Sequence, residues 1–403
     1  MIYEDGVFST GSDKMRIAFF GLQQAFDYNH IGGSESITRR LARELTQDAD
    51  VDAADYVLFH ARRTETQEVM PKVRVRYFEA YADAAKALLD GYDHVVSIYL
   101  SPPERIPFMA FRARYQHRIR FHAFVTMWRR SRWKRLLLTI DLQFMPLNGA
   151  MFAISPRLYK SVKRWARRPF LILPPVPDEW FLRVVDKPVR SRLHVTFVGR
   201  IDPGKGAADA AELFYRLQDA KKYQCRFIGY TYEPGRVSRT EEALYGRLKA
   251  LPPGTFVEAN YSKYSPQVDA VVRKTMAETD VLLLPYRDVS STADMPLVFM
   301  EGMASLCALI IPPSAADLPL VYGPGKFYLR EDAWVESMRQ NLLSVSKFLR
   351  EERERIEARN AQLNFGAAAS AQAFKRALLG QEPPRVGAWP ENLLTFKGSL
   401  FAR

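Results

Sequence analysis

The sequence predicts an α/β protein built from two doubly wound parallel-sheet domains. Short apolar runs typical of buried strands alternate with segments of helical periodicity along nearly the whole chain. A chain of 403 residues, 47% of them hydrophobic, is long enough for two packed cores. Four prolines between positions 174 and 188 indicate a linker between the two halves.

The first half opens with an apolar strand at residues 15–21, and a Gly-Gly turn and a helix follow. Ile37, Leu41 and Leu45 fall on one face of that helix. His122 lies inside a later apolar run, and we expect it in the core or at its flank. The further strands expected in this half are residues 56–59, 73–78, 94–99, 121–127 and 149–155.

The second half begins again with a strand at residues 193–199. Its other expected strands are 225–229, 255–259, 281–284 and 306–311, and its expected helices are 207–220, 267–278, 296–304 and 331–360. The chain then divides into a loose leader (1–14), a first domain (15–175), a linker (176–190), a second domain (191–380) and a tail (381–403).

Composition excludes several classes of protein. No window offers the roughly 20 consecutive apolar residues of a membrane span, and residues 1–14 lack the pattern of a signal peptide. Cys225 and Cys307 both lie in expected strands, which favours free, buried thiols in a reducing compartment over a disulfide. No Cys/His cluster has the spacing of metal ligands, so we predict no metal site.

A net charge of +13 predicts an anionic partner. Ten Lys or Arg and no acidic residue lie between Arg105 and Ile140. Two Trp among five basic residues suit the headgroup zone of an anionic membrane, which makes this segment a candidate for membrane docking. The alternative is a solvated basic helix face whose Trp pack inward. RNA binding is disfavoured because no recognised nucleic-acid module accompanies the charge. The docking candidates are Trp128, Arg129, Arg130, Arg132, Trp133, Lys134 and Arg135.

Residues 280–312 predict one strand–helix–strand crossover with a polar loop after its first strand. Ligands bind at that end of the strands in open α/β sheets, and the free amides of a helix start suit a phosphate. Glu301 lies on the expected helix in an apolar neighbourhood. It therefore needs a partner, because burying a lone carboxylate is costly.

Three segments together resemble the retaining GT-B glycosyltransferases of family 4. The first is the Gly-Gly turn, Gly32 and Gly33, after the opening strand. The second, FVGRIDPGKG at residues 197–206, is similar to the family's phosphate-binding pattern F-V-G-R-L … K-G. The third is the crossover at residues 280–312. The segments follow the family's order and approximate spacing over nearly the whole chain.

This resemblance implies two Rossmann-like domains that face each other across a cleft, with the second holding most of a nucleoside diphosphate sugar. Arg200 and Lys205 would neutralise the diphosphate, so that no metal or other cofactor is required. Glu301 matches the second glutamate of the family's E-x7-E motif, which typically binds the ribose hydroxyls. The implied donor-binding residues are Gly32, Gly33, Gly199, Arg200, Lys205, Met295, Pro296, Leu297 and Glu301.

The chain departs from the family pattern at two points. The first glutamate of the motif falls at Ala293, and Asp294 is one residue out of register. Asp294 then either contacts the donor sugar or caps the following helix. In addition, the strand at residues 121–127 leads into Trp128 rather than into the His that family members often carry there. The implied catalytic residues are Arg200, Lys205, Glu301 and Asp294.

The resemblance thus implies transfer of a sugar, with retention, to a lipid-linked or polysaccharide acceptor in cell-surface glycan synthesis. The protein would act in the cytoplasm, bound peripherally to the inner face of the plasma membrane. Two other classes stay open. One is a sugar-nucleotide epimerase or a phosphorylase of the same fold. The other is a non-catalytic GT-B scaffold or partner subunit, which Ala293 and the missing His favour.

Overall fold

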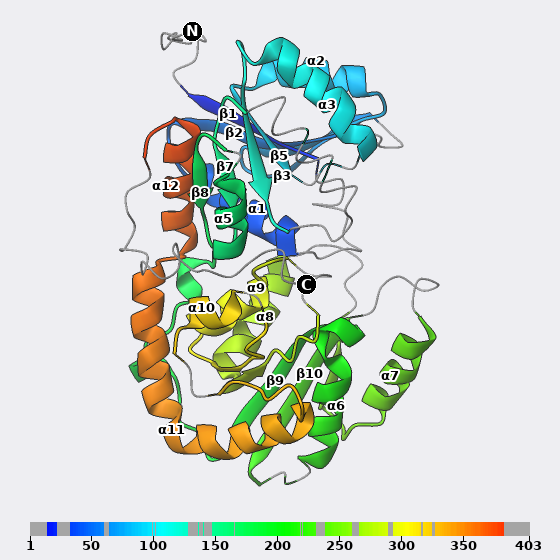
Figure 1. The fold of residues 1–403 in the computed structure, drawn as a ribbon, viewed down its shortest axis with the longest axis vertical. Helices are drawn as coiled ribbons and strands as arrows, with labels where there is room; N and C mark the ends of the chain where they lie inside the picture. Colours follow the sequence, from blue (N-terminus) through cyan, green and yellow to red (C-terminus); the bar gives the residue numbers. More distant parts are fainter. Residues whose placement is uncertain are drawn as a thin grey trace.

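The computed structural model contains two α/β domains stacked along the long axis of the molecule (Figure 1). The structure describes residues 14–21, 33–59, 64–98, 100, 102–127, 136, 140, 147–164, 166–217, 219, 221–230, 238–259, 266–288, 293–315, 317–324 and 327–382. Within these residues, no helix is both long enough and apolar enough to cross a membrane.

The first domain is an eight-stranded sheet of order β3-β4-β2-β1-β5-β6-β7-β8, in which only the β3–β4 pair is antiparallel. Its strands are β1 (Met15–Phe20), β2 (Val51–Phe59), β3 (Glu65–Met70), β4 (Val73–Phe78), β5 (His94–Ile98), β6 (Arg120–Val125), β7 (Met151–Ala153) and β8 (Pro169–Leu171). The edge strands β3 and β8 are not among the predicted strands. Their short, half-exposed sequences carry little periodicity.

Helices cover both faces of this sheet, so its central strands are buried on both sides. The helices are α1 (Gly33–Leu45), α2 (Tyr81–Gly91), α3 (Pro102–Tyr115) and α5 (Pro156–Val162). Ile37 and Leu41 of α1 pack on one face, as their spacing predicted. Leu88 of α2 and Phe108 of α3 pack on the other.

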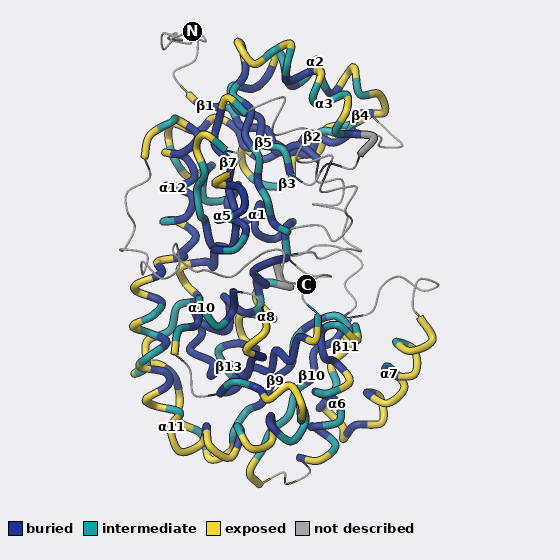
Figure 2. Tube along the Cα trace, viewed as in Figure 1, coloured by how far each residue is buried: buried dark blue, intermediate teal, exposed yellow. Residues whose placement is uncertain are grey.

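The second domain is a five-stranded, all-parallel sheet of order β11-β10-β9-β12-β13. Its strands are β9 (Leu193–Arg200), β10 (Tyr223–Tyr230), β11 (Phe256–Glu258), β12 (Val281–Leu283) and β13 (Ala308–Ile310). Its helices are α6 (Ala207–Arg216), α7 (Arg239–Lys249), α8 (Pro266–Glu278), α9 (Leu297–Ala304), α10 (Leu318–Tyr322) and α11 (Trp334–Leu363). The predicted fold class, two parallel-sheet α/β domains, is confirmed. In Figure 2 the central strands of both sheets lie buried, whereas α7 is largely exposed.

The last helix, α12 (Ala367–Leu378), returns to the first domain (Figure 1). Phe374 stacks on Phe152 of β7 with ring centroids 4.2 Å apart, and Lys375 Nζ lies 2.6 Å from Asp48 Oδ2. The range expected for the second domain, 191–380, includes this helix, which the structure places on the first sheet. Local sequence predicts an amphipathic helix but does not specify which of two similar sheets receives it.

The two chain segments that connect the domains are hydrogen-bonded to each other. Val176 N donates to Phe365 O at 3.1 Å, and Ala367 N donates to Val176 O at 2.8 Å. A Cβ at Gly366 would lie 2.3 Å from Asp178 Oδ1, so a larger residue there would displace this carboxylate. The domains are therefore joined by one double-stranded connection. The linker expected at 176–190 begins here, and it contains two short 3-10 helices, Asp178–Trp180 and Val184–Asp186.

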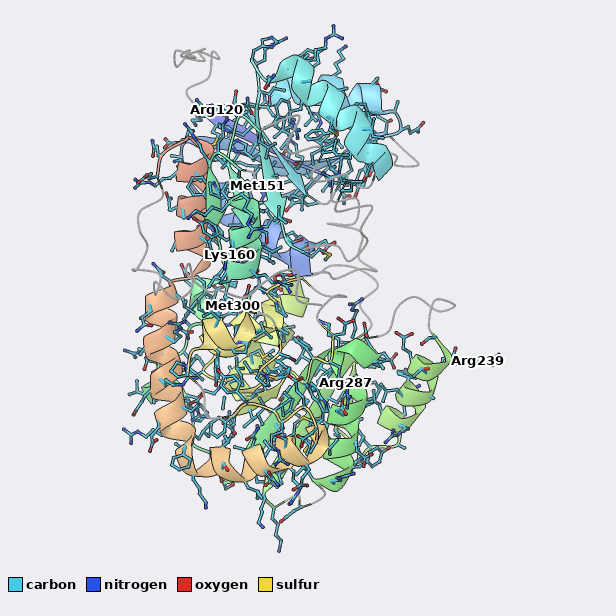
Figure 3. All side chains as sticks on the ribbon, in the orientation of Figure 1. Arg120, Met151, Lys160, Arg239, Arg287 and Met300 are labelled. Carbon is cyan, nitrogen blue, oxygen red and sulfur yellow. The ribbon has the colours of Figure 1, made fainter. Side chains whose placement is uncertain are left out.

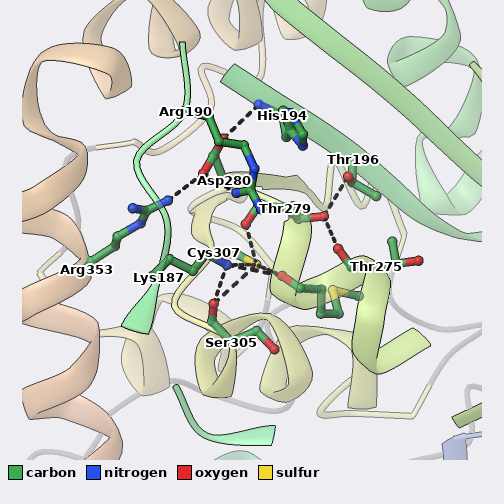
Figure 4. Close-up of polar contacts among 11 residues, drawn as sticks. Lys187, Arg190, His194, Thr196, Thr275, Thr279, Asp280, Ser305, Cys307 and Arg353 are labelled. Carbon is green, nitrogen blue, oxygen red and sulfur yellow. Dashed lines mark hydrogen bonds and ion pairs between the residues drawn. The ribbon is translucent and has the colours of Figure 1, made fainter. Parts of the chain in front are cut away.

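The far end of the linker is fixed to the second domain by a buried lysine (Figure 4). Lys187 Nζ donates to Ser305 O at 2.6 Å and to Met276 O at 3.2 Å. Cys307 Sγ lies 4.0 Å away, and burial raises the pKa of its thiol. Beside it, Arg353 Nη2 of α11 lies 2.5 Å from Asp280 Oδ1. Both Cys225 and Cys307 are free thiols, as predicted.

We expect Lys187→Met to lower the free energy of unfolding by about 1–3 kcal/mol, because the buried carbonyls of Ser305 and Met276 each lose one donor. Urea denaturation measures this loss. Lys347→Met, at an exposed position of α11, is the control and should change stability by less than about 0.5 kcal/mol. Equal stability of the two variants would contradict the anchoring role of Lys187.

Candidate functional site

The carboxyl edge of the second sheet brings two predicted site segments together. β12 pairs with β9 in parallel, with Leu283 opposite Phe197. Arg200 at the end of β9 and Tyr286, three residues beyond Leu283, therefore emerge at the same edge. Gly199 lies within β9, opposite Gly229 of β10. Ligands of open α/β sheets bind at this edge.

The loop after β9 closes tightly onto the loop after β12. Asp202 Oδ1 accepts a hydrogen bond from Gly204 N at 2.7 Å, and Asp288 N donates to Gly204 O at 3.0 Å. Gly206 has a φ of 68°, and a Cβ there would lie 1.9 Å from Pro285 O. Glycine is thus required for the turn that directs the preceding lysine.

That lysine, Lys205, is buried beside a second cation. Only 8% of it is exposed, and its Nζ lies 4.7 Å from the centre of the Tyr286 ring. Burial, and then the nearby Arg200 guanidinium, lower the pKa of Lys205 to about 7. Arg200 Nη2 lies 3.6 Å from Asp202 Oδ2. The edge therefore concentrates positive charge in a desolvated setting, where an anionic ligand would favour the protonated lysine.

Helix α9 starts at the same edge, directly after Met295 and Pro296. Pro296 is in extended conformation and no side chain caps the helix, so the first amides, beginning at Leu297, have no capping side chain. Such amides suit a phosphate group.

Glu301, in the second turn of α9, has the partner that its burial requires. Its Oε1 lies 2.6 Å from Nη2 of Arg40, which belongs to α1 of the first domain. Burial raises the pKa of the Glu301 carboxyl, and Arg40 opposes that rise. The pair therefore joins the two domains. Arg40 carries no sequence signal that distinguishes it from Arg39 beside it.

Asp294 makes a second pair across the domains. Arg157 Nη2, in the first turn of α5, lies 2.5 Å from Asp294 Oδ1, and Ser155 Oγ donates to Asp294 Oδ2 at 2.9 Å. The residue before α9 is Pro296, so Asp294 does not occupy the N-cap that the sequence left as an alternative. Its backbone amide donates to Thr126 O at 2.9 Å.

Gly33, the first residue of α1, faces this loop from the first domain. A Cβ at Gly33 would lie 3.6 Å from that of Ala293, which is ordinary van der Waals contact. Ser34 Oγ, next in the chain, donates to Thr126 Oγ1 at 2.8 Å. The loop before α9 is therefore held against α1 and the end of β6. Gly32 lies outside the described residues.

The predicted site residues thus fall into three groups. Arg200, Lys205 and the start of α9 lie at one edge, and Glu301 and Asp294 lie where the two domains meet. The whole membrane-docking set, Trp128, Arg129, Arg130, Arg132, Trp133, Lys134 and Arg135, lies outside the described residues. Among the described residues, no cluster of three or more His, Cys, Asp or Glu side chains is arranged to hold a metal ion.

His122 lies in the core, as predicted. Its Nδ1 accepts a hydrogen bond from Ala150 N at 2.8 Å, so its Nε2 carries the proton shared with His94 Nδ1, 3.1 Å away. Burial lowers the pKa of His122 well below its usual value and that of His94 to about 3. Both rings are therefore neutral near pH 7.

Comparisons with known proteins identify the fold. No protein-family model and no curated protein matches the chain. Among solved structures, the Anabaena protein HepE in complex with UDP-glucose matches with a TM-score of 0.61 and 12% sequence identity, over 91% of this chain and 100% of that one. An α-glucosyltransferase in complex with UDP and a 13-mer DNA matches with a TM-score of 0.57 and 11% identity, over 91% and 100% of the chains.

A UDP-forming trehalose-phosphate synthase from Burkholderia vietnamiensis also matches, with a TM-score of 0.57 and 13% identity, over 91% of this chain and 100% of that one. At such identities the likeness is one of fold. The chain therefore has the GT-B fold, with two Rossmann-like domains and the candidate site at the carboxyl edge of the second sheet.

Asp317, beside the Arg157–Asp294 pair, provides a pH-dependent test of this interdomain cluster. Arg157 N donates to its Oδ2 at 2.7 Å, and burial raises the pKa of its carboxyl from 3.8 to about 6. The pKa of Asp317 is higher in the folded protein than in the unfolded chain. The contribution of this carboxyl to stability is therefore fully present below about pH 4, and it is lost as the pH rises through about 6. As the pH rises from about 4 to about 7, the free energy of unfolding of Asp317→Asn should therefore increase relative to that of wild type by up to about 3 kcal/mol.

Urea denaturation across that pH range measures the difference. Asp332→Asn, at an exposed position, is the control and should follow wild type at every pH. A constant difference between Asp317→Asn and wild type would show that this carboxyl titrates normally.

Proposed function

We propose that the protein is a glycosyltransferase that moves a sugar from a nucleoside diphosphate sugar to a lipid-linked or polysaccharide acceptor. The observation that carries this proposal is the buried Lys205 beside Arg200, at the sheet edge where α9 begins. A lysine held in a desolvated site next to another cation suits a ligand with concentrated negative charge. A diphosphate is such a ligand, and the GT-B neighbours HepE and the α-glucosyltransferase were solved with UDP-glucose or UDP.

The departing nucleoside diphosphate gains negative charge as the bond to the sugar breaks. Arg200, Lys205 and the first amides of α9 would stabilise that charge in place, without a metal ion. Glu301 would hold the ribose hydroxyls. We further propose family 4 chemistry, in which the acceptor attacks the face that the diphosphate leaves and a phosphate oxygen takes the acceptor proton. Retention of configuration then needs no side-chain base, so the missing His does not prevent transfer.

For the sugar end of the donor, the cluster of Ala293, Asp294 and Arg157 is the proposed contact region. Ala293 carries no carboxylate, and both oxygens of Asp294 are hydrogen-bonded to residues of the first domain. This arrangement favours one second candidate, a partner subunit that binds the donor without transferring it. Incubation of the protein and donor with a pool of glycan and lipid-linked acceptors separates the two, because only the enzyme releases nucleoside diphosphate at an acceptor-dependent rate.

The first prediction from this proposal concerns the diphosphate. In a thermal-shift screen of UDP-, GDP- and dTDP-sugars, a ligand well above its Kd should stabilise the wild type by about 3 kcal/mol. Arg200→Ala and Lys205→Ala should lose most of that shift. Because Lys205 has a pKa of about 7, binding should weaken and take up a proton as the pH rises above that value.

Lys222→Ala is the matched control, since Lys222 is exposed and precedes β10 at the opposite edge of the same sheet. It should keep the full shift. If a nucleotide sugar still stabilises Lys205→Ala and Arg200→Ala as much as wild type, the diphosphate does not bind at this edge.

The second prediction concerns a peripheral position on the cytoplasmic face of an anionic membrane. Neutralising Arg129, Arg130, Arg132, Lys134 and Arg135 together should abolish binding to phosphatidylglycerol vesicles and reduce transfer to lipid-linked acceptors. Each such charge near an anionic surface contributes about 1 kcal/mol.

A second set of five exposed arginines provides the control: Arg118, Arg164, Arg167, Arg168 and Arg376. They precede β6 and β8 or end α12, at the edge marked by Arg120 in Figure 3, far from Met300 of α9. Neutralising this set should leave transfer unchanged. Equal loss of vesicle binding in both variants would indicate that net charge alone attracts the membrane, and unchanged activity in the first variant would indicate a soluble acceptor.

A further inference from the structure

Arg40 of α1 contacts four separate parts of the molecule from a fully buried position. Its Nη2 lies 2.6 Å from Glu301 Oε1 of α9 and 3.8 Å from Asp269 Oδ1 of α8. Its Nη1 donates to Pro175 O at 3.2 Å, and its guanidinium lies over the Trp180 ring at 4.9 Å. With 4% of it exposed, this side chain has little freedom to move.

These contacts fix the position of the guanidinium independently of Glu301. Pro175 and Trp180 flank Val176, where the two interdomain connections are hydrogen-bonded together. Arg40 is therefore held at the connection that joins the domains, and it reaches from there into the second domain. A planar guanidinium held in this way offers its hydrogen-bond donors in one fixed orientation.

Glu301 has one oxygen committed to this contact and one that is not. Oε1 accepts from Arg40, whereas no described residue donates a hydrogen bond to Oε2. The charged groups that face the carboxyl are Arg40 of α1 and Asp269 of α8, and only Arg40 favours its ionised form. Arg40 thus orients the carboxyl from one side and opposes the rise of its pKa, while Oε2 has no donor among the described residues and can accept a hydrogen bond.

We propose that Arg40 is a positioning residue for nucleotide recognition: it holds Glu301 so that Oε2 accepts hydrogen bonds from the ribose hydroxyls of the donor. This inference rests on the proposed function. It adds that Glu301 connects the ribose to Arg40 of the first domain. The ribose would therefore be recognised at the interface between the domains. Arg40 itself does not touch the nucleotide.

The test compares UDP with 2′-deoxy-UDP by isothermal titration calorimetry. A hydroxyl bonded to a carboxylate gives wild type a preference for UDP of about 10- to 100-fold. In Arg40→Met the preference should fall below about 3-fold, because Glu301 loses its orientation and the cation that opposes the rise of its pKa. Raising the pH should restore part of the preference in this variant. Arg40→Lys, which keeps a charge, should retain an intermediate preference.

Two further variants make the outcome specific. Glu301→Gln should lose the preference as Arg40→Met does, and the double variant should lose no more than either, since the residues act on one contact. Arg157→Met breaks a second arginine–carboxylate pair between the domains, and because UDP carries no sugar to reach the proposed sugar-contact region, this variant should keep the preference for UDP. Circular dichroism confirms that each variant is folded, and Glu301→Gln tests the contact even if Arg40→Met does not fold.

The outcomes separate this inference from the function on which it rests. If wild type binds no nucleoside diphosphate, the proposed function and this inference both fail. If wild type binds UDP and Arg40→Met keeps the full preference over 2′-deoxy-UDP, only the role of Arg40 fails. Loss of the preference in Arg157→Met as well would assign the effect to a loosened interface and would also overturn that role.

Discussion

The ion pair between Arg40 and Glu301 is the interaction on which the arrangement of the two domains depends. A carboxylate on an apolar helix is unstable alone in a protein interior, and truncating either member of such a buried pair typically costs about 3–5 kcal/mol. Here the partner comes from the other domain, so the cost of burying Glu301 is offset only when α1 and α9 are in contact. Contact between the two domains at this point is therefore built into the packing of the second domain.

The carboxyl edge of the second sheet shows the opposite balance of charge. Arg200 lies close enough to Lys205 to lower the pKa of the lysine, and Asp202 compensates only in part. The close approach of Gly206 to Pro285 helps to fix the loop that holds them. A rigid backbone that holds like charges together is the kind of preorganisation that would suit a polyanionic leaving group.

The sequence predicts what depends on local pattern and leaves open what depends on tertiary contact. Alternating apolar runs predict both parallel sheets, and the strand order brings Arg200 and the loop before α9 to one edge. The position of α12 on the first sheet could not be predicted, because Phe374 and Lys375 would suit any apolar face with acidic neighbours. Arg40 was equally hidden, since burial of Glu301 demands a cation but does not say which of the arginines supplies it.

The same reasoning explains why the acidic residue stands at position 294 rather than at position 293. A carboxylate at position 293 would face Gly33, which offers no side chain to pair with it. One residue later, Asp294 meets Arg157 and Ser155 at the end of β7. In this chain the acidic residue is therefore placed where the first domain can neutralise it. This end of the candidate site then combines a carboxylate with a guanidinium that is still partly exposed, and the two side chains come from different domains.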